Sequence, residues 1–334
     1  MSAQPQAATL AQRVFQRLGD GEYSSGEALA AELGVSRSAV WKAVRSLEAA
    51  GVRIDAVTHR GYRLATGLVA LDAARIMAGL SPAARSRLAA CEVAWTLPST
   101  NAALLAGAEP APGRAVALLA EHQTTGRGRR GREWIAPLGG ALCLSLAWTF
   151  PALPQDLGAL SLVVGVCALR SLTAAGAVGL ALKWPNDLVA GGRKLGGILI
   201  EMRAESAGPV LVVIGIGLNV ALGEAARARV TAAGTEAVDI LELGGDVDRN
   251  RLAAALLEQL LGALPRFAAK GFAPFSAEWR AADVLRGRPV SVLLGAEREA
   301  GIARGIDAAG ALLVETPGGL RRFVAGEVSV RAQA

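Results

Sequence analysis

The spacing of the apolar residues changes twice along the chain, and this constrains the fold more than any other feature. Residues 7–50 place apolar side chains three or four positions apart, as amphipathic helices do. Strand-like and helical runs then alternate as far as residue 284, whereas residues 286–331 contain short alternating strands divided by glycines. At 334 residues, the chain is longer than one hydrophobic core usually supports. We therefore expect an α+β protein with three domains, over residues 1–65, 66–284 and 285–334.

The first domain has the pattern of a winged helix-turn-helix. Ser24, with Glu27 three residues later, predicts the start of a second helix, and Ser36 predicts the start of a third. Residues 52–57 and 62–64 then alternate like a hairpin, which would form the wing. The residues that we expect to face DNA are Arg37, Ser38, Trp41, Lys42, Arg45, His59 and Arg60. Because charged side chains are usual on any solvated helix, an ordinary exposed face is the alternative.

Composition excludes several classes of protein. Only two histidines, His59 and His122, are available for a histidine-based triad or a multi-histidine metal site, so we expect no metal centre. The three cysteines lie among apolar neighbours without paired spacing, as buried thiols do. The apolar stretches are interrupted well before the ~20 residues of a membrane span, and the polar start lacks a secretory signal pattern. We therefore expect a cytoplasmic protein with no membrane partner.

The strongest local signal is EHQTTGRGRRGREW, residues 121–134, which follows an apolar strand-like run. Four arginines lie within seven residues, and the glycines let the backbone approach a ligand, so the loop suits phosphate or carboxylate groups. Gly126, Gly128 and Gly131 formally match the dinucleotide-binding fingerprint, but that motif requires a helix directly afterwards, and none is predicted. Two alternatives remain open: an anion-binding loop of an active site, or a basic loop that contacts nucleic acid.

Three further segments place polar residues beside predicted elements. KWPND, residues 183–187, ends the run 178–182, which we expect to be a buried strand. KLGGILIEM begins with Lys194 at the entrance of another strand, and GIGLN, residues 215–219, ends a third. STN, residues 99–101, precedes a helical run. Taken singly, these segments are ordinary turn residues, a glycine-rich strand end and an N-cap.

In this order and spacing, the four segments resemble the biotin protein ligase family, and GRGRRGREW together with KWPND is the most specific part of the resemblance. The front, SSGEALAAELGVSRSAVWKAVRSLEAAGV followed by RGYRL, is similar to the DNA-binding domain of the bifunctional members that also act as repressors. The resemblance implies a winged helix-turn-helix, a central mixed α/β domain related to class II synthetase-like folds, and a C-terminal SH3-like β-barrel.

The resemblance also implies a two-step reaction. The carboxylate of biotin attacks the α-phosphate of ATP, with Mg²⁺ present, and this gives biotinyl-5′-AMP and pyrophosphate. A lysine of a biotin carboxyl carrier protein then takes the acyl group. The bifunctional members further imply operator DNA as a partner, biotin-responsive repression and a homodimer formed on adenylate binding.

Residue by residue, the resemblance assigns roles to positions of this chain. The expected catalytic residues are Arg129 and Lys194, which would neutralise the biotin carboxylate and the α-phosphate. The residues expected to bind biotin are Ser99, Thr100, Asn101, Gln123, Gly126, Arg127, Arg129, Lys194 and Gly197. The residues expected to bind ATP are Arg129, Arg132, Trp134, Lys183, Asn186, Asp187 and Asn219.

Two other functions are compatible with the sequence. A winged helix would also suit a repressor whose central domain senses a ligand and has no ligase activity. A lipoate or other acyl protein ligase would use the same adenylate chemistry, although the two specific motifs favour biotin. His122 departs from the aromatic residue usual in the family, and we expect it to be a partly buried strand residue without a catalytic role.

Overall fold

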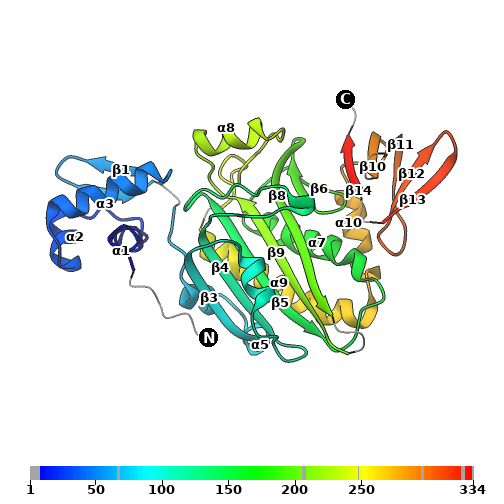
Figure 1. Ribbon diagram of the computed structural model, residues 1–334, viewed down its shortest axis with the longest axis horizontal. Helices are drawn as coiled ribbons and strands as arrows, with labels where there is room; N and C mark the ends of the chain where they lie inside the picture. Colours follow the sequence, from blue (N-terminus) through cyan, green and yellow to red (C-terminus); the bar gives the residue numbers. More distant parts are fainter. Residues whose placement is uncertain are drawn as a thin grey trace.

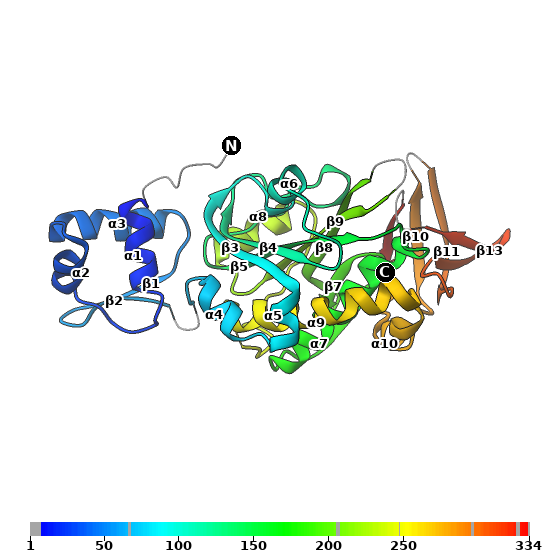
Figure 2. The same cartoon turned by 90° about the horizontal axis from the view of Figure 1, so that it is seen from below.

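The computed structural model describes residues 8–65, 68–204, 208–246, 248–294, 297–324 and 328–332. These residues form three units that follow one another across Figure 1, with a helical unit in blue, a large central unit, and a small β unit in orange and red. The view from below in Figure 2 shows the same order. The expected domain boundary after residue 65 adjoins residues 66 and 67, which lie outside the described residues.

The N-terminal unit is the expected winged helix-turn-helix. It contains α1 (Leu10–Arg17), α2 (Gly26–Leu33), α3 (Arg37–Ala49), β1 (Ile54–Val57) and β2 (Gly61–Leu64). Ser36 caps α3 as predicted, because its hydroxyl accepts a hydrogen bond from the amide of Ala39. The prediction that Ser24 begins α2 is wrong, since Ser25 is the cap. Ser24 instead exchanges backbone hydrogen bonds with Tyr62 and thereby joins the helices to the wing.

A seven-stranded sheet in the order β3-β4-β5-β9-β8-β7-β6 forms the centre of the molecule. Its strands are β3 (Leu88–Leu97), β4 (Ala115–Gln123), β5 (Ala141–Phe150), β6 (Leu180–Lys183), β7 (Asp187–Ala190), β8 (Arg193–Ala204) and β9 (Val210–Asn219). Among the described residues of this sheet, β3 and β4 pair in parallel and the other neighbouring strands pair antiparallel. The expected strand from Val178 starts two residues later, because Gly179 turns the chain with a φ of 70° and leaves Val178 67 % exposed.

The two faces of β5 show how the sheet separates core from site. Leu142, Leu144 and Leu146 face the main core with α7 (Leu160–Ala174) and α9 (Arg249–Lys270). Ala147, one position out of phase, instead packs with leucines of α6 (Thr100–Ala106). The remaining helices and short helical turns of the central unit are α4 (Ala73–Ala78), α5 (Pro82–Arg87), α8 (Glu224–Ala232), α10 (Ser276–Ala282), η1 (Arg129–Gly131), η2 (Leu157–Ala159) and η3 (Ala273–Phe275).

Two helical segments, Leu157–Ala174 and α9, are long and apolar enough to cross a membrane by composition alone. In this fold, 61 % and 56 % of their most apolar windows are buried. They pack against each other and against the central sheet (Figure 2). Their hydrophobicity is therefore explained by the core that they build.

The C-terminal unit is a small SH3-like β domain. Its strands are β10 (Pro289–Leu294), β11 (Glu297–Ile306), β12 (Leu312–Thr316), β13 (Gly319–Phe323) and β14 (Val328–Ala332), in the antiparallel order β13-β12-β11-β10-β14. Its apolar interior is continuous with the main core of the central unit. Trp184, fully buried after β6, donates its indole N–H to the carbonyl of Gly310 at 3.1 Å. The domain is therefore docked on the central unit by both apolar and polar contacts.

Candidate active site

A cavity of about 1030 Å³, open at its mouth, lies on the face of the sheet that α6 covers. Its walls come from the start of α6, the end of β4, the glycine-arginine loop, β5, β8 and β9, which are far apart in the sequence. The STN, GRGRRGREW, KWPND, KLGGILIEM and GIGLN segments therefore all contribute to one cavity.

One end of the cavity has a polar floor built around Gln123. The Gln123 side-chain oxygen accepts hydrogen bonds from the backbone amide and the hydroxyl of Thr100, at 2.7 and 3.1 Å. Ser99 caps α6 through the amide of Ala102 and also lines the cavity. Because its oxygen is held twice, the Gln123 amide nitrogen is oriented as a donor for a ligand.

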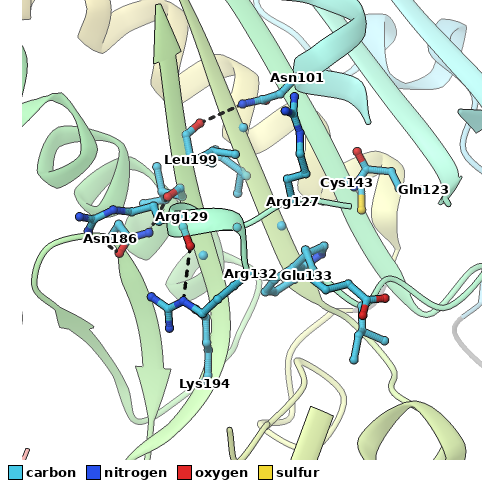
Figure 3. A pocket seen from close by; sticks show the side chains of 18 of the residues that line it. Asn101, Gln123, Arg127, Arg129, Arg132, Glu133, Cys143, Asn186, Lys194 and Leu199 are labelled. Carbon is cyan, nitrogen blue, oxygen red and sulfur yellow. Dashed lines mark hydrogen bonds between the residues drawn. The ribbon is translucent and has the colours of Figure 1, made fainter. Parts of the chain in front are cut away.

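Ser145 and Glu201 support this floor, and neither was identified from the sequence. The Ser145 hydroxyl, fully buried on β5, lies 2.7 Å from the Thr100 hydroxyl and 2.6 Å from the Asn101 side-chain oxygen. The Asn101 amide nitrogen donates to Glu201 at 2.9 Å, and Glu201 also lies 3.6 Å from the Arg127 guanidinium. Figure 3 shows Arg127 beside Asn101 at this end. For Ser145, the sequence offered one signal of a supporting role, a single serine within an otherwise apolar run of β5.

The glycine-arginine segment is a tight loop, and no helix follows it. Its base is closed by hydrogen bonds from the amide of Trp134 to the carbonyl of Gly126, at 2.8 Å, and from Gly128 to Arg132, at 2.6 Å. A side chain at position 126 would place its Cβ 2.5 Å from the Trp134 carbonyl oxygen, so only glycine fits. The next regular element is the strand β5, which confirms that the segment is not a dinucleotide-binding turn.

Arg129, on the glycine-arginine loop, and Lys194, on β8, both line this cavity and both lie near Asp187. The Arg129 guanidinium donates to the Asn186 side-chain oxygen at 3.2 Å, as Figure 3 shows. The Lys194 ammonium lies 2.6 Å from an Asp187 carboxylate oxygen. Burial lowers the pKa of Arg129, and the Asp187 carboxylate partly opposes that shift. An arginine stays protonated nonetheless, so two cations from stretches 65 residues apart converge here.

Trp134 forms part of the cavity wall. Its indole lies directly on Gly217, where an added Cβ would be 2.5 Å from the ring. The Lys194 ammonium lies 6.0 Å from the ring centroid. Cys143 lines the cavity beside Gln123 (Figure 3), and burial raises the pKa of its thiol to about 12. At neutral pH, Cys143 is therefore a neutral thiol rather than a nucleophile.

The remaining expected ligand residues divide into those that line the cavity and those that do not. Asn219 lines it, but its amide donates to the carbonyls of Lys194 and Val238, both at 3.1 Å. It therefore holds the backbone of Lys194 in place. Lys183 and Gly126 are absent from the described lining of the cavity, whereas the other expected biotin and ATP residues are present in it.

The cavity is also covered by a segment that was not identified from the sequence. α8 and the residues after it contribute Val230, Thr235 and Ala237 to the wall. Arg229 of α8 lies 3.1 Å from Glu133 of the glycine-arginine loop. Among the described residues, no group of three or more His, Cys, Asp or Glu side chains is arranged to hold a metal ion.

The residues expected to contact DNA lie on the exposed surface of the N-terminal unit. Arg37, Ser38, Trp41, Lys42 and Arg45 are exposed on α3, whose opposite face is buried, and His59 and Arg60 are exposed in the turn of the wing. Trp41 is 51 % exposed, which is unusual for a large aromatic side chain. Arg60 lies over the ring of Tyr23 at 4.2 Å. α3 and the wing therefore present basic and aromatic groups together.

Comparison with known proteins identifies each unit. The Biotin/lipoate A/B protein ligase family matches residues 97–219, an HTH domain family matches residues 11–63, and the Biotin protein ligase C terminal domain matches residues 286–331. The chain is 36 % identical to the bifunctional ligase/repressor BirA of Escherichia coli, over 97 % of this chain and 98 % of that protein.

Two further comparisons support the central and C-terminal units. The biotin--[acetyl-CoA-carboxylase] ligase of Mycobacterium tuberculosis is 40 % identical over 69 % of this chain and 85 % of that protein. The biotin protein ligase from Aquifex aeolicus, solved in complex with biotin and ATP, superposes with a TM-score of 0.61. It is 27 % identical and covers 73 % of this chain and 100 % of that one.

Proposed function

The chain belongs to the family of bifunctional biotin protein ligases and repressors, and we propose that it activates biotin with ATP in the cavity of Figure 3. The acyl group then passes to a lysine of a biotin carboxyl carrier protein. The observation that supports this most is the convergence of Arg129 and Lys194 on one cavity. A carboxylate and a triphosphate, both anions, must come together there. The positive charges of the two side chains reduce the repulsion between these anions.

The polar floor is the proposed biotin end of the cavity. Gln123, with its oxygen held by Thr100, would donate its amide to the biotin head group. Ser99 and Asn101 add further polar groups, while Arg127 and Gly197 would enclose the ligand, with Gly126 acting from outside the described lining. Ser145 and Glu201 hold these groups in place without needing to contact biotin.

The first chemical step is the attack of a biotin carboxylate oxygen on the α-phosphorus of ATP. The new oxygen–phosphorus bond forms as the bond to the β-phosphate bridging oxygen breaks, and pyrophosphate leaves. Arg129 and Lys194 are positioned to stabilise the charge that develops on the α-phosphate oxygens. In the second step, the lysine amine attacks the acyl carbon, loses a proton and releases AMP, so the enzyme needs no nucleophile of its own.

The proposed ATP end lies between the glycine-arginine loop and β7. Trp134 would pack against the adenine, and Arg132, Asn186 and Lys183 would contact the nucleotide, with Lys183 acting from outside the described cavity wall. Mg²⁺ usually binds through one or two carboxylates together with substrate phosphates. Two carboxylates are on the described wall, Glu133, which is paired with Arg229, and Asp187, which lies beside Lys194. Asp187, next to the proposed catalytic lysine, would hold Mg²⁺, and a bound Mg²⁺ would supply further positive charge to the phosphates.

The second function is repression through operator DNA. The exposed basic and aromatic surface of α3 and the wing supports this, since a recognition helix and a wing contact the major groove and backbone together. We further propose a homodimer that forms on adenylate binding, a cytoplasmic location, and domain boundaries after residues 65 and 284. The family matches at 11–63, 97–219 and 286–331 are compatible with these boundaries.

Exchange of labelled pyrophosphate into ATP tests the ligase directly. The full chain should catalyse this exchange only when biotin is present, and Arg129→Gln should reduce the rate roughly 100- to 1000-fold. Arg130→Gln is the matched control, because Arg130 is an exposed neighbour on the same loop and does not line the described cavity. Folded protein without exchange would favour a sensor that lacks ligase activity, and exchange with lipoate instead of biotin would favour the other acyl ligase.

A further inference from the structure

A buried ion pair outside the active-site cavity joins β4 to the start of α9. The Arg249 guanidinium lies 2.7 Å from the Glu121 carboxylate, and the two side chains are 0 % and 4 % exposed. Neither residue takes part in the proposed chemistry. Removing two charges from water destabilises the fold unless further hydrogen bonds satisfy the buried groups. The other hydrogen-bond partners of Glu121 and Arg249 therefore indicate what the pair holds in place.

On one side, the pair holds the connector between the winged helix and the central unit. Arg249 donates to the carbonyl of Val69 at 2.8 Å, and Glu121 accepts the amide of Leu71 at 2.6 Å. Asn250, next to Arg249, donates to the carbonyl of Ala70 at 2.8 Å and accepts the amide of Asp72 at 2.7 Å. Four successive connector residues, 69–72, are thus bonded to side chains of β4 and α9. We call Glu121, Arg249 and Asn250 the connector clamp.

On the other side, the clamp belongs to the strands that carry the polar floor. Glu121 is two residues before Gln123 on β4; Glu121 faces Arg249 of α9 whereas Gln123 contacts Thr100 of α6, so the two side chains are linked through the backbone of that strand. Arg249 also donates to the carbonyl of Ala141 at 3.3 Å. Ala141 begins β5, two residues before Cys143, which lines the cavity. A displacement of the clamp would therefore displace the ends of both strands.

The winged helix is itself seated on this region. Phe15 of α1 packs edge-on against Trp95 of β3, with 5.2 Å between ring centroids. Leu68 and Leu138 belong to the same buried cluster as the core of the winged helix. A Cβ at Gly19 would lie 2.6 Å from the Ala70 side chain, so the turn that follows α1 meets the connector closely. The DNA-binding unit thus contacts the clamped segment.

We propose that Glu121, Arg249 and Asn250 are positioning residues that couple the biotin end of the cavity to the connector of the winged helix. This inference rests on the proposed function, because it takes Gln123 as a biotin contact. Coupling of this kind is reciprocal. Releasing the connector weakens biotin binding, and bound biotin protects the connector amides from hydrogen exchange.

Three full-chain variants test the coupling. Asn250→Ala releases two connector bonds without burying a charge. Glu121→Gln leaves Arg249 unpaired, so it should lower the melting temperature as well as biotin affinity. Glu121→Gln combined with Arg249→Met removes both charges, but methionine cannot donate to the carbonyls of Val69 and Ala141. Arg170→Met is the matched control, because Arg170 pairs with Glu278 on the surface, away from the connector.

The expected result is a rise of roughly tenfold in the biotin dissociation constant of Asn250→Ala and of the double variant, measured by calorimetry without ATP. The KM for ATP should stay within twofold of the wild-type value. The double variant should recover much of the melting temperature lost by Glu121→Gln while its biotin affinity stays low. Biotin should slow amide exchange over residues 69–72 in the wild type and in Arg170→Met, but not in Asn250→Ala.

Other outcomes overturn the inference. If biotin affinity returns together with melting temperature in the double variant, the pair serves stability alone. Unchanged biotin affinity in folded Asn250→Ala, or a KM for ATP that rises equally, also refutes the coupling. If the double variant does not fold, Asn250→Ala decides the question. A wild-type chain that binds no biotin refutes the proposed function along with this inference, whereas normal wild-type binding with unaffected variants refutes this inference alone.

Discussion

Gly217→Ala should separate the nucleotide end of the cavity from the stability of the fold. Gly217 lies on β9, where its backbone is paired with Cys143 of β5 and Gly197 of β8, so the backbone cannot yield. An alanine Cβ would lie 2.5 Å from Cε2 of Trp134 and 2.8 Å from its Cζ2 and Nε1. Ordinary carbon contacts are roughly 3.5–4.0 Å. The indole must therefore move back by about 1 Å.

The size of the effect follows from this displacement. Overpacking of this kind costs about 1–3 kcal/mol. If that cost falls on the adenine contact of Trp134, it corresponds to a rise of roughly 5- to 150-fold in the KM for ATP, at about 1.4 kcal/mol per tenfold. The melting temperature should change little, because Trp134 is only partly buried and lies on a loop that can shift.

The assay is biotin-dependent pyrophosphate exchange at varied ATP and saturating biotin, with tryptophan fluorescence to report the movement of the indole. Gly223→Ala is the matched control, because nothing lies within 4 Å of its added Cβ and its φ is −73°. A folded Gly217→Ala variant with a KM for ATP within twofold of the wild type would refute the placement of Trp134 at the nucleotide. A rise in the KM for biotin alone would assign Trp134 to the other end.

Three further predictions follow from the same structure. Ser145→Ala leaves the Asn101 side-chain oxygen without its serine donor, which should cost about 1–3 kcal/mol. Calorimetry should show weaker biotin binding with little change in ATP affinity. A biotin affinity equal to that of the wild type would exclude Ser145 from the floor. Burial raises the pKa of Cys143 to about 12, so its thiolate forms only far above neutral pH. Iodoacetamide at pH 8 should therefore label Cys143 in the unfolded chain but not in the folded one. Rapid labelling of Cys143 in the folded protein would contradict its burial. Lys42→Gln should reduce the slope of the logarithm of the DNA-binding constant against the logarithm of salt concentration by about 1. Arg17→Gln, which removes a charge paired with an acidic side chain on α2, should leave this slope unchanged. Equal slopes for both variants would remove Lys42 from the DNA contact.

Local sequence signals predicted the elements well where neighbours along the chain determine the structure. Ser36 caps α3 because a cap needs only a hydroxyl beside the first free amides. The glycine-arginine stretch was expected to be a loop without a following helix, and the structure confirms this. The choice between Ser24 and Ser25 was wrong, because the pairing of Ser24 with Tyr62 comes from the wing rather than from the helix.

The side chains that hold the site residues in place could not be predicted from local sequence signals. Ser145 and Asn101 are 44 residues apart, and Glu121 and Arg249 are farther apart still, so no periodicity relates them. In the sequence, a serine or glutamate within an apolar strand has no predictable role until its hydrogen-bond partner is known. Only the fold supplies that partner, because a polar group is stabilised by whatever tertiary packing brings within about 3 Å.

The sequence by itself determined the three-part architecture, the elements and the kinds of side chain that could neutralise anions. Those properties depend on periodicity and on the chemistry of residues close together in the chain. The tertiary structure alone decided that Arg129 and Lys194 share one cavity, that Lys183 stands outside its described wall, and that the connector is clamped by a buried ion pair. Electrostatic and hydrogen-bonding energies depend on distance in space, and distance along the chain does not specify it.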